Sequence, residues 1–339
     1  MNELLQIKNL KVSYHTHDGD IHAVQGVSFT IDKGEAVALV GESGCGKSVT
    51  AKSILGLIQP PVGRVEEGSE IFFEGKNLLL QSKKEWQKFR GKECAIVFQD
   101  ALASLNPTLT VGKQIAEKIV LHNKVSKKEA YKEAERLLGM VGITDAEKRI
   151  SQYPHEFSGG MRQRVMIAIA LACNPKLLIA DEPTTALDVT IQADILDLIK
   201  QIQKDYHMTV IMITHDLGIV ANIAKKIIVM YSGKIVESGS NYEIFYNPKH
   251  PYTRALLNVV LSLDSDENCA LVPIEGTPPN MLHTITGCAF ADRCEHCMEI
   301  CRKHEPPVFM FEDDHIAQCW LYHEMADNNR KDVEKTDGQ

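Results

Sequence analysis

The octapeptide Gly-Glu-Ser-Gly-Cys-Gly-Lys-Ser at residues 41–48 is the most informative stretch of this chain. It follows the apolar run Glu-Ala-Val-Ala-Leu-Val at 35–40 and precedes the helix-compatible segment Val-Thr-Ala-Lys-Ser-Ile-Leu-Gly-Leu at 49–57. A strand, a glycine-rich loop and a helix, in that order, are the context that this pattern requires for phosphate binding. The sequence therefore predicts an α/β fold built around a phosphate-binding loop.

The residue types in this loop are those that a nucleotide needs. Gly41, Gly44 and Gly46 permit backbone angles that turn successive N–H groups toward phosphate oxygens. The helix that follows directs its positive end at the same anion. We expect Lys47 to reach the β- and γ-phosphates and Ser48 to bind Mg²⁺. The neighbouring residues complete the predicted ATP contacts: Glu42, Ser43, Cys45 and Val49.

Two carboxylates follow a second apolar run. Asp181 and Glu182 come directly after Leu-Leu-Ile-Ala at 177–180, which has the composition of a buried parallel strand. Open α/β sheets bind their ligands at the carboxyl ends of such strands. We therefore expect Asp181 to bind the magnesium ion and Glu182 to act as general base toward the attacking water.

Two further polar residues have the same placement. Gln99 follows Ile-Val-Phe at 96–98, and His215 follows Ile-Met-Ile-Thr at 211–214. The placement predicts that Gln99 lies near the magnesium ion and the attacking water and that His215 contacts the γ-phosphate.

Composition limits the classes of function. A chain of 339 residues that is 44% hydrophobic can bury a large core, and we expect more than one domain. A formal net charge of −8 gives no reason to expect a nucleic acid partner. No targeting segment is recognisable, and the longest apolar run, 165–173, is far shorter than the ~20 residues that cross a bilayer. Membrane attachment would therefore come through another protein.

Periodicity indicates how the chain is organised. Residues 1–34 alternate apolar and polar side chains, which predicts antiparallel strands beside the nucleotide core. Residues 111–122 and 127–141 read as helices of an insert, and 190–206 as an amphipathic helix of the core. Asp188 is a candidate N-cap of that last helix.

Five of the nine cysteines lie between residues 288 and 319. The lack of an export signal argues against a disulfide framework. Soft thiolates at such spacings suit an iron–sulfur cluster or zinc, and four of them are enough for either. Unligated thiols in a small appendage are the alternative reading.

The order of these motifs resembles that of ABC-transporter ATPases over most of residues 1–250. In that family a signature loop binds the γ-phosphate held by the opposite subunit, so each active site is shared across a head-to-tail dimer. The resemblance implies that Tyr14 stacks on adenine, unless it is an ordinary half-buried strand tyrosine, and that Asp188 links the two sites. It assigns the signature loop acting in trans to these residues: Ser158, Gly159, Gly160 and Met161.

The end of the chain narrows the resemblance to the first ATPase subunit of oligopeptide and dipeptide importers. Gly-Thr-Pro-Pro at 276–279, Arg293-Cys294 and the closing His-x-x-x-Cys319 carry the match. The resemblance implies a 4Fe–4S cluster, with zinc as the alternative metal, on four residues: Cys288, Cys294, Cys301 and Cys319. Cys297 is off that pattern, so the choice of four among five cysteines stays open.

The resemblance also implies the division of the chain. We expect the antiparallel β subdomain and phosphate-loop core in 1–99 and the helical signature subdomain in 100–165. The second part of the ATPase core follows in 166–255, a small Cys-rich extension in 256–326, and a disordered tail in 327–339.

Function and partners follow from the same resemblance. It implies an ATP-hydrolysing subunit that powers a peptide importer from the cytoplasmic face of the cell membrane. The implied partners are a sister ATPase or a second copy, two transmembrane permease subunits and an extracytoplasmic peptide-binding protein. Nickel or glutathione uptake is an alternative cargo, and a soluble ABC ATPase in translation or DNA repair is an alternative class. A regulatory module with a silent ATPase conflicts with intact Lys47, Asp181, Glu182 and His215.

Overall fold

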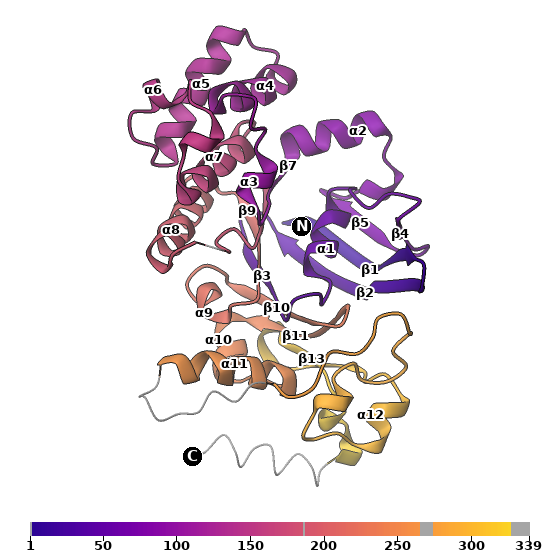
Figure 1. Ribbon diagram of the computed structural model, residues 1–339. Helices are drawn as coiled ribbons and strands as arrows, with labels where there is room; N and C mark the ends of the chain where they lie inside the picture. Colours follow the sequence, from indigo (N-terminus) through magenta and orange to yellow (C-terminus); the bar gives the residue numbers. More distant parts are fainter. Residues whose placement is uncertain (1, 186, 265–273, 327–339) are drawn as a thin grey trace. The chain divides into compact units, whose positions relative to one another are not determined.

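The computed structural model describes residues 2–185, 187–264 and 274–326, so the expected tail 327–339 lies outside the described residues. The chain divides into two compact units, each made of several segments of the sequence; Figure 1 colours the chain by residue number, from indigo to yellow. Unit 1 contains Met1–Leu5, Thr30–Ala36 and Phe72–Ile213; unit 2 contains Gln6–Phe29, Val37–Ile71 and the chain from Thr214 onward. The boundaries expected near residues 99, 165 and 255 are a finer division and stay a prediction.

Three parallel strands form the centre of unit 1. They are β7 (Cys94–Val97), β8 (Leu177–Asp181) and β9 (Thr209–Thr214), with Cys94 opposite Leu177 and Leu177 opposite Thr209. Every residue of β8 and β9 is buried. Strands with both faces covered read as continuous apolar runs, which explains why their positions could be predicted.

The helical insert and the long core helix were predicted correctly. The insert forms α4 (Val111–Asn123) and α5 (Lys127–Met140), followed by α6 (Ala146–Arg149). Figure 1 shows these helices gathered beside α7 (Gly159–Leu171). Ser126 and Glu129 form a reciprocal capping box that begins α5.

The expected cap of helix α8 (Val189–Tyr206) is wrong in one respect. Asp188 occupies the N-cap position, but its side chain makes no capping hydrogen bond. Its backbone carbonyl instead accepts from the N–H of Gln192. The sequence predicted where the helix starts. Whether the Asp188 side chain turns toward the helix depends on the residues around it, which the sequence pattern does not specify.

The remaining elements of unit 1 are short. They are β6 (Lys76–Asn77), η1 (Leu78–Leu80), α2 (Lys83–Lys88), η2 (Phe89–Glu93), α3 (Ala101–Ser104) and η3 (Pro154–Glu156).

The strands expected in residues 1–34 are present as β1 (Glu3–Thr16) and β2 (Gly19–Asp32). Two more short strands follow the first helix: β4 (Gly63–Val65) and β5 (Glu70–Phe73). In unit 2, β1 pairs antiparallel with β4, and Tyr14 lies opposite Gly63.

A second set of strands in unit 2 carries the phosphate loop. β3 (Ala36–Val40) lies parallel to β10 (Lys226–Tyr231), and β10 lies antiparallel to β11 (Lys234–Ser240). The Cys-rich extension adds β13 (Ile316–Gln318) to β11 and β12 (Val308–Met310) to β13. A strand of three residues is too short to show a recognisable alternation of apolar and polar side chains. The pairing of the extension with the core strands was therefore not predicted.

Helices and aromatic rings complete the core of unit 2. The helices are α1 (Lys47–Ile54), α9 (Leu217–Val220), α10 (Asn241–Tyr246) and α11 (Pro251–Asp264). Tyr231, Tyr252 and Phe290 form a cluster, with ring centroids 4.6 Å apart for the two tyrosines and 5.3 Å from each to Phe290. Phe290 belongs to the extension, which therefore shares the core of unit 2.

The extension itself contains mostly single turns. They are η4 (Ala291–Arg293), α12 (Glu299–Lys303), η5 (Glu312–Asp314), η6 (Trp320–Tyr322) and η7 (Glu324–Ala326). Across the described residues, none of the helices combines the length and the apolar character that crossing a membrane requires.

Candidate nucleotide site

The phosphate loop joins β3 to α1 as predicted, and two of its glycines are sterically required. Gly41 has φ +146°, and a Cβ there would lie 2.1 Å from the carbonyl oxygen of Met230. Gly46 is the N-cap of α1 with φ +103°, and its Cβ would lie 2.6 Å from the carbonyl oxygen of Ala23. The loop therefore packs its backbone directly on neighbouring backbone, which only glycine permits.

Lys47 lies inside this loop. Its side chain is nearly buried, with the residue 4% exposed. Nζ donates to the carbonyl oxygens of Gly41 at 2.7 Å and of Glu42 at 2.9 Å. The positive charge is thus held within the ring of backbone that surrounds a bound phosphate in such loops. Ser43 and Gly44, at the open side of the loop, are exposed to solvent.

Cys45 turns its thiol inward. The residue is 4% exposed, and burial raises the pKa of the thiol above its ordinary value. A buried thiol with a raised pKa is a poor nucleophile, so we expect Cys45 to react slowly with alkylating reagents.

Two residues distant in the sequence anchor Glu42. Its backbone N–H donates to the Tyr252 hydroxyl at 2.8 Å. Its carboxylate forms a bidentate ion pair with Arg293, at 2.7 and 2.9 Å. Sequence reasoning assigned no role in the site to Tyr252 or Arg293, because both are far from the loop along the chain.

The structure brings Gln99 and Glu182 together in unit 1. Gln99 Nε2 donates to Glu182 Oε2 at 2.8 Å, and the hydroxyl of Thr185 donates to the same oxygen at 3.0 Å. Glu182 has φ +47°, in the left-handed region that non-glycine residues rarely adopt. Strained backbone of this kind clusters at functional sites, where the surrounding structure holds it in place.

Asp181 is the last residue of β8 and is 6% exposed. It lies opposite Ile213 of β9 in the parallel ladder. The carboxylate therefore stands at the carboxyl edge of the unit 1 sheet, next in sequence to Glu182, as the sequence predicted.

The signature residues form the beginning of α7. Ser158 is its N-cap, and Oγ accepts from the N–H of Met161 at 3.4 Å. Ser158 and Gly159 are exposed, whereas Gly160 is buried against Ile191, whose Cγ2 would lie 2.6 Å from an added Cβ. An exposed amino end of a 13-residue helix is a favourable place for an anion.

His215 and Tyr14 belong to unit 2. His215 is exposed and lies between β9 and α9, where Asp216 caps α9 through Gly218 at 2.8 Å. Tyr14 is half-buried on β1, and its ring lies close over Gly63. This packing is compatible with either reading of Tyr14, adenine stacking or a strand tyrosine.

The clustered cysteines are buried or half-buried thiols of the extension. Burial raises the pKa of Cys288 to about 11 and that of Cys294 to about 12, and burial also raises that of Cys319. The backbone N–H groups of the residues two positions further on lower the pKa of these three thiols, but burial has the larger effect. Among the described residues, no group of three or more His, Cys, Asp or Glu side chains forms a metal site.

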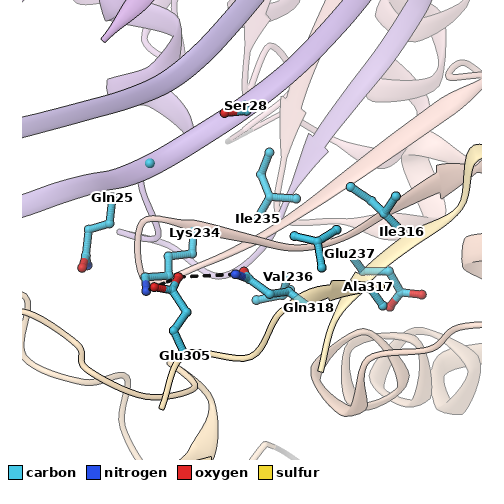
Figure 2. Close-up of a pocket in the computed structure, with 12 residues that line it drawn as sticks. Gln25, Ser28, Lys234, Ile235, Val236, Glu237, Glu305, Ile316, Ala317 and Gln318 are labelled. Carbon is cyan, nitrogen blue, oxygen red and sulfur yellow. Dashed lines mark hydrogen bonds and ion pairs between the residues drawn. The ribbon is translucent and has the colours of Figure 1, made fainter. Parts of the chain in front are cut away.

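Figure 2 shows a hollow in unit 2 and the residues that line it. It measures about 170 Å³ and lies among β2, β11, β13 and the segment that carries Glu305. Lys234 and Glu305 form an ion pair across it at 2.6 Å, and Gln318 also reaches Glu305. Ligand pockets usually measure roughly 300–1,000 Å³. The hollow is too small for a nucleotide, and none of its lining residues belongs to the loop.

Comparison with known proteins confirms the class that the fold and loop define. Residues 24–185 match the family model described as "ABC transporter". A dimeric ATP-binding cassette, MJ0796, solved in a post-hydrolysis state with ADP and Pi, superposes with a TM-score of 0.63 at 28% identity. The match covers 70% of this chain and 99% of that one. These are the features of the ATP-binding cassettes of ABC transporters.

Sequence relatives narrow the class to one family of ATP-binding cassettes. The chain is 54% identical to the oligopeptide transport ATP-binding protein OppD of Bacillus subtilis (strain 168), over 95% of this chain and 90% of the relative. It is 50% identical to the dipeptide transport ATP-binding protein DppD of the same organism, over 97% of each. Residues 236–301 match the model "Oligopeptide/dipeptide transporter, C-terminal region". The chain therefore belongs to the ATP-binding proteins of the oligopeptide and dipeptide transporter family.

Proposed function

We propose that this protein binds and hydrolyses ATP as a motor subunit of an importer for dipeptides or oligopeptides. One observation carries the proposal: a complete phosphate loop, signature segment and Asp181-Glu182 pair occur in a chain 54% identical to an oligopeptide transport ATP-binding protein over 95% of its length. The relatives carry the cargo assignment, because the ATPase does not contact the cargo in the transport scheme that the resemblance implies.

Each site residue has a part in this proposal. Lys47 and the loop amides bind the phosphates, and Tyr14 stacks on adenine. Ser48 and Asp181 supply hydroxyl and carboxylate oxygens, which are ligands that Mg²⁺ prefers. The metal ion, when bound, neutralises phosphate charge. Glu182 takes a proton from the attacking water, Gln99 orients the same water, and His215 contacts the γ-phosphate.

The hydrogen bonds around Glu182 support its assignment as the base. Gln99 and Thr185 both donate to Oε2, so one carboxylate oxygen has two fixed partners. A carboxylate held in this way is oriented before water arrives, which favours proton transfer.

The signature segment supports a site shared by two subunits. Ser158 and Gly159 are exposed at the amino end of α7, where they are accessible to a nucleotide held by another subunit. The solved cassette that this chain resembles is dimeric with ADP and Pi. Asp188, exposed before α8, is proposed to link the two sites of the dimer.

The proposed assembly contains a sister ATPase or a second copy, two transmembrane permease subunits and an extracytoplasmic peptide-binding protein. This chain would sit at the cytoplasmic face of the membrane as a peripheral subunit. Closing of the ATPase pair on ATP would drive the permeases between their two states, and hydrolysis would reset them.

The cysteines fit a metal centre by their chemistry, and we include a 4Fe–4S cluster on Cys288, Cys294, Cys301 and Cys319 in the proposal. The backbone N–H of Cys288 donates to the carbonyl oxygen of Cys301 at 2.7 Å, which brings two of the four residues side by side. Buried thiols are ionised when a metal cation compensates their charge. Backbone amides that donate to sulfur are a common feature around iron–sulfur clusters.

A transport assay tests the proposed function. The complex, purified with its membrane subunits and placed in lipid vesicles, is expected to hydrolyse ATP faster when a peptide-loaded binding protein is added, and to accumulate the peptide. A complex carrying Lys47→Ala serves as the inactive control. Stimulation by nickel or glutathione in place of peptide would reassign the cargo, and recovery of the protein with ribosomes or DNA would remove the transport function.

The metal proposal is tested by composition. Protein purified without oxygen is expected to be brown and to contain about four iron atoms and four acid-labile sulfides per chain. Cys319→Ser is expected to lose the iron, whereas Cys297→Ser is expected to keep it, because Cys297 lies off the pattern of the four. A colourless protein with one zinc atom, or iron lost equally from both variants, would contradict the assignment.

A further inference from the structure

Arg293 of the Cys-rich extension reaches the phosphate loop. Its Nη1 and Nη2 donate to the two carboxylate oxygens of Glu42 at 2.7 and 2.9 Å. Both residues belong to unit 2 and are 251 positions apart in the sequence. The second residue of the loop is thus paired with a side chain that lies next to Cys294.

Every donor of this guanidinium is used. Nη1 also donates to the Tyr231 hydroxyl at 3.1 Å, and Nη2 to the carbonyl oxygen of Ile274 at 3.0 Å. Nε donates to the carbonyl oxygen of Glu275 at 2.9 Å. Arginine has five N–H donors in a fixed fork, and here five acceptors surround it. Its side chain is 5% exposed, so a shorter or uncharged side chain would leave buried acceptors without a donor.

Glu42 is held equally completely. Besides the ion pair, its N–H donates to Tyr252 at 2.8 Å and its carbonyl oxygen accepts from Lys47 at 2.9 Å. Backbone and side chain of this loop residue are therefore both fixed, and one of the partners is the lysine that is proposed to bind phosphate. A displacement of Glu42 would therefore also displace the ammonium group of Lys47.

Charge explains why the pair matters for an anionic ligand. A carboxylate near the phosphates of ATP would repel them unless a cation compensates it. Arg293 supplies that cation, and its pKa is raised further above its usual range by the hydrogen bond to Glu42. The carboxylate of Glu42 is 26% exposed, so water screens only part of its charge.

We propose that Arg293 is a positioning residue of the nucleotide site, which neutralises Glu42 and holds the first half of the phosphate loop in its binding conformation. The proposal rests on the proposed function, because it assumes that the loop binds ATP. It assigns the extension a direct part in nucleotide affinity, separate from any metal it holds.

Arg302 provides a matched control in the same extension. It pairs with Asp292, and the two side chains are 58% and 77% exposed. Within the part of the chain that the structure describes, no hydrogen bond or ion pair joins Arg302 to the phosphate loop. Exposed ion pairs contribute little to stability or binding. Arg302→Ala therefore removes the same kind of side chain without touching the site.

The test measures ATP affinity of the purified chain by calorimetry, with magnesium present. Arg293→Ala is expected to raise the Kd for ATP about tenfold or more, which corresponds to about 1.4 kcal/mol. Combining it with Glu42→Gln is expected to recover most of this loss, since no unpaired carboxylate then remains. Arg302→Ala is expected to bind like the wild type.

Three results would overturn the inference. One is an Arg293→Ala variant that binds ATP with the affinity of the wild type. Another is a double variant whose Kd for ATP is as high as that of Arg293→Ala, which would mean that Arg293 acts only by stabilising the extension. The third is an equal loss in Arg302→Ala. Thermal unfolding is followed on the same samples, and if Arg293→Ala is unfolded, Arg293→Gln replaces it with the same thresholds. A wild-type chain that does not bind ATP would instead refute the proposed function.

Discussion

Glu182→Gln is expected to bind ATP with the affinity of the wild type and to hydrolyse it at least about a hundredfold more slowly, the loss typical of removing a general base. The amide has the size and shape of the carboxylate but cannot accept a proton from water at neutral pH. Because Glu182 is proposed to touch only the attacking water, the loss should appear in kcat, with the binding of ATP unchanged.

The substitution leaves the hydrogen bonds and the backbone around Glu182 unchanged. Oε2 accepts from Gln99 and from Thr185, and an amide oxygen can accept the same two hydrogen bonds. The backbone at φ +47° is unaffected by the exchange of one side-chain atom. Glu147→Gln is the matched control, because Glu147 is an exposed carboxylate of α6 in the same unit. Turnover above a tenth of the wild-type rate in Glu182→Gln would exclude Glu182 as the base.

Lys47→Ala is expected to abolish both ATP binding and hydrolysis, with the Kd for ATP raised by about a hundredfold or more. Lys47 is 4% exposed, and its ammonium group lies within the phosphate loop. Removing it leaves the triphosphate without its central cation. It also leaves the carbonyl oxygens of Gly41 and Glu42 without the donor that now holds them at 2.7 and 2.9 Å.

A second lysine on the same helix separates this effect from loss of fold. Lys52 lies in the last turn of α1, away from the loop, so Lys52→Ala should bind ATP normally. Both variants should show circular dichroism spectra like that of the wild type. Retention of ATP binding by Lys47→Ala would show that the triphosphate does not occupy this loop and would remove the basis of the proposed function.

Several parts of the fold could be read from the sequence because they depend on local pattern. The helix after the phosphate loop, the two long helices of the insert and the buried strand before Asp181 were all placed correctly. Periodic burial over ten or more residues specifies such elements with little help from their surroundings. The same holds for the loop itself, since glycine spacing and the following lysine define its backbone path.

Other features could not be predicted because they depend on partners distant in the chain. Asp188 stands at the start of α8 without capping it through its side chain. The thiol of Cys45 is buried by the packing of the loop. Arg293 appeared only as part of a family pattern beside Cys294, and nothing near it in the sequence pointed to Glu42.

Short-range pattern and residue chemistry were sufficient to predict the class of fold, the position of the phosphate loop and the residues that are candidates for catalysis. The three-dimensional packing was needed to show that the extension adds β13 to β11 and places a buried arginine on the second residue of the loop. An ion pair across 251 residues, like a strand of three residues, forms through the packing of the whole unit and leaves no periodic trace along the chain.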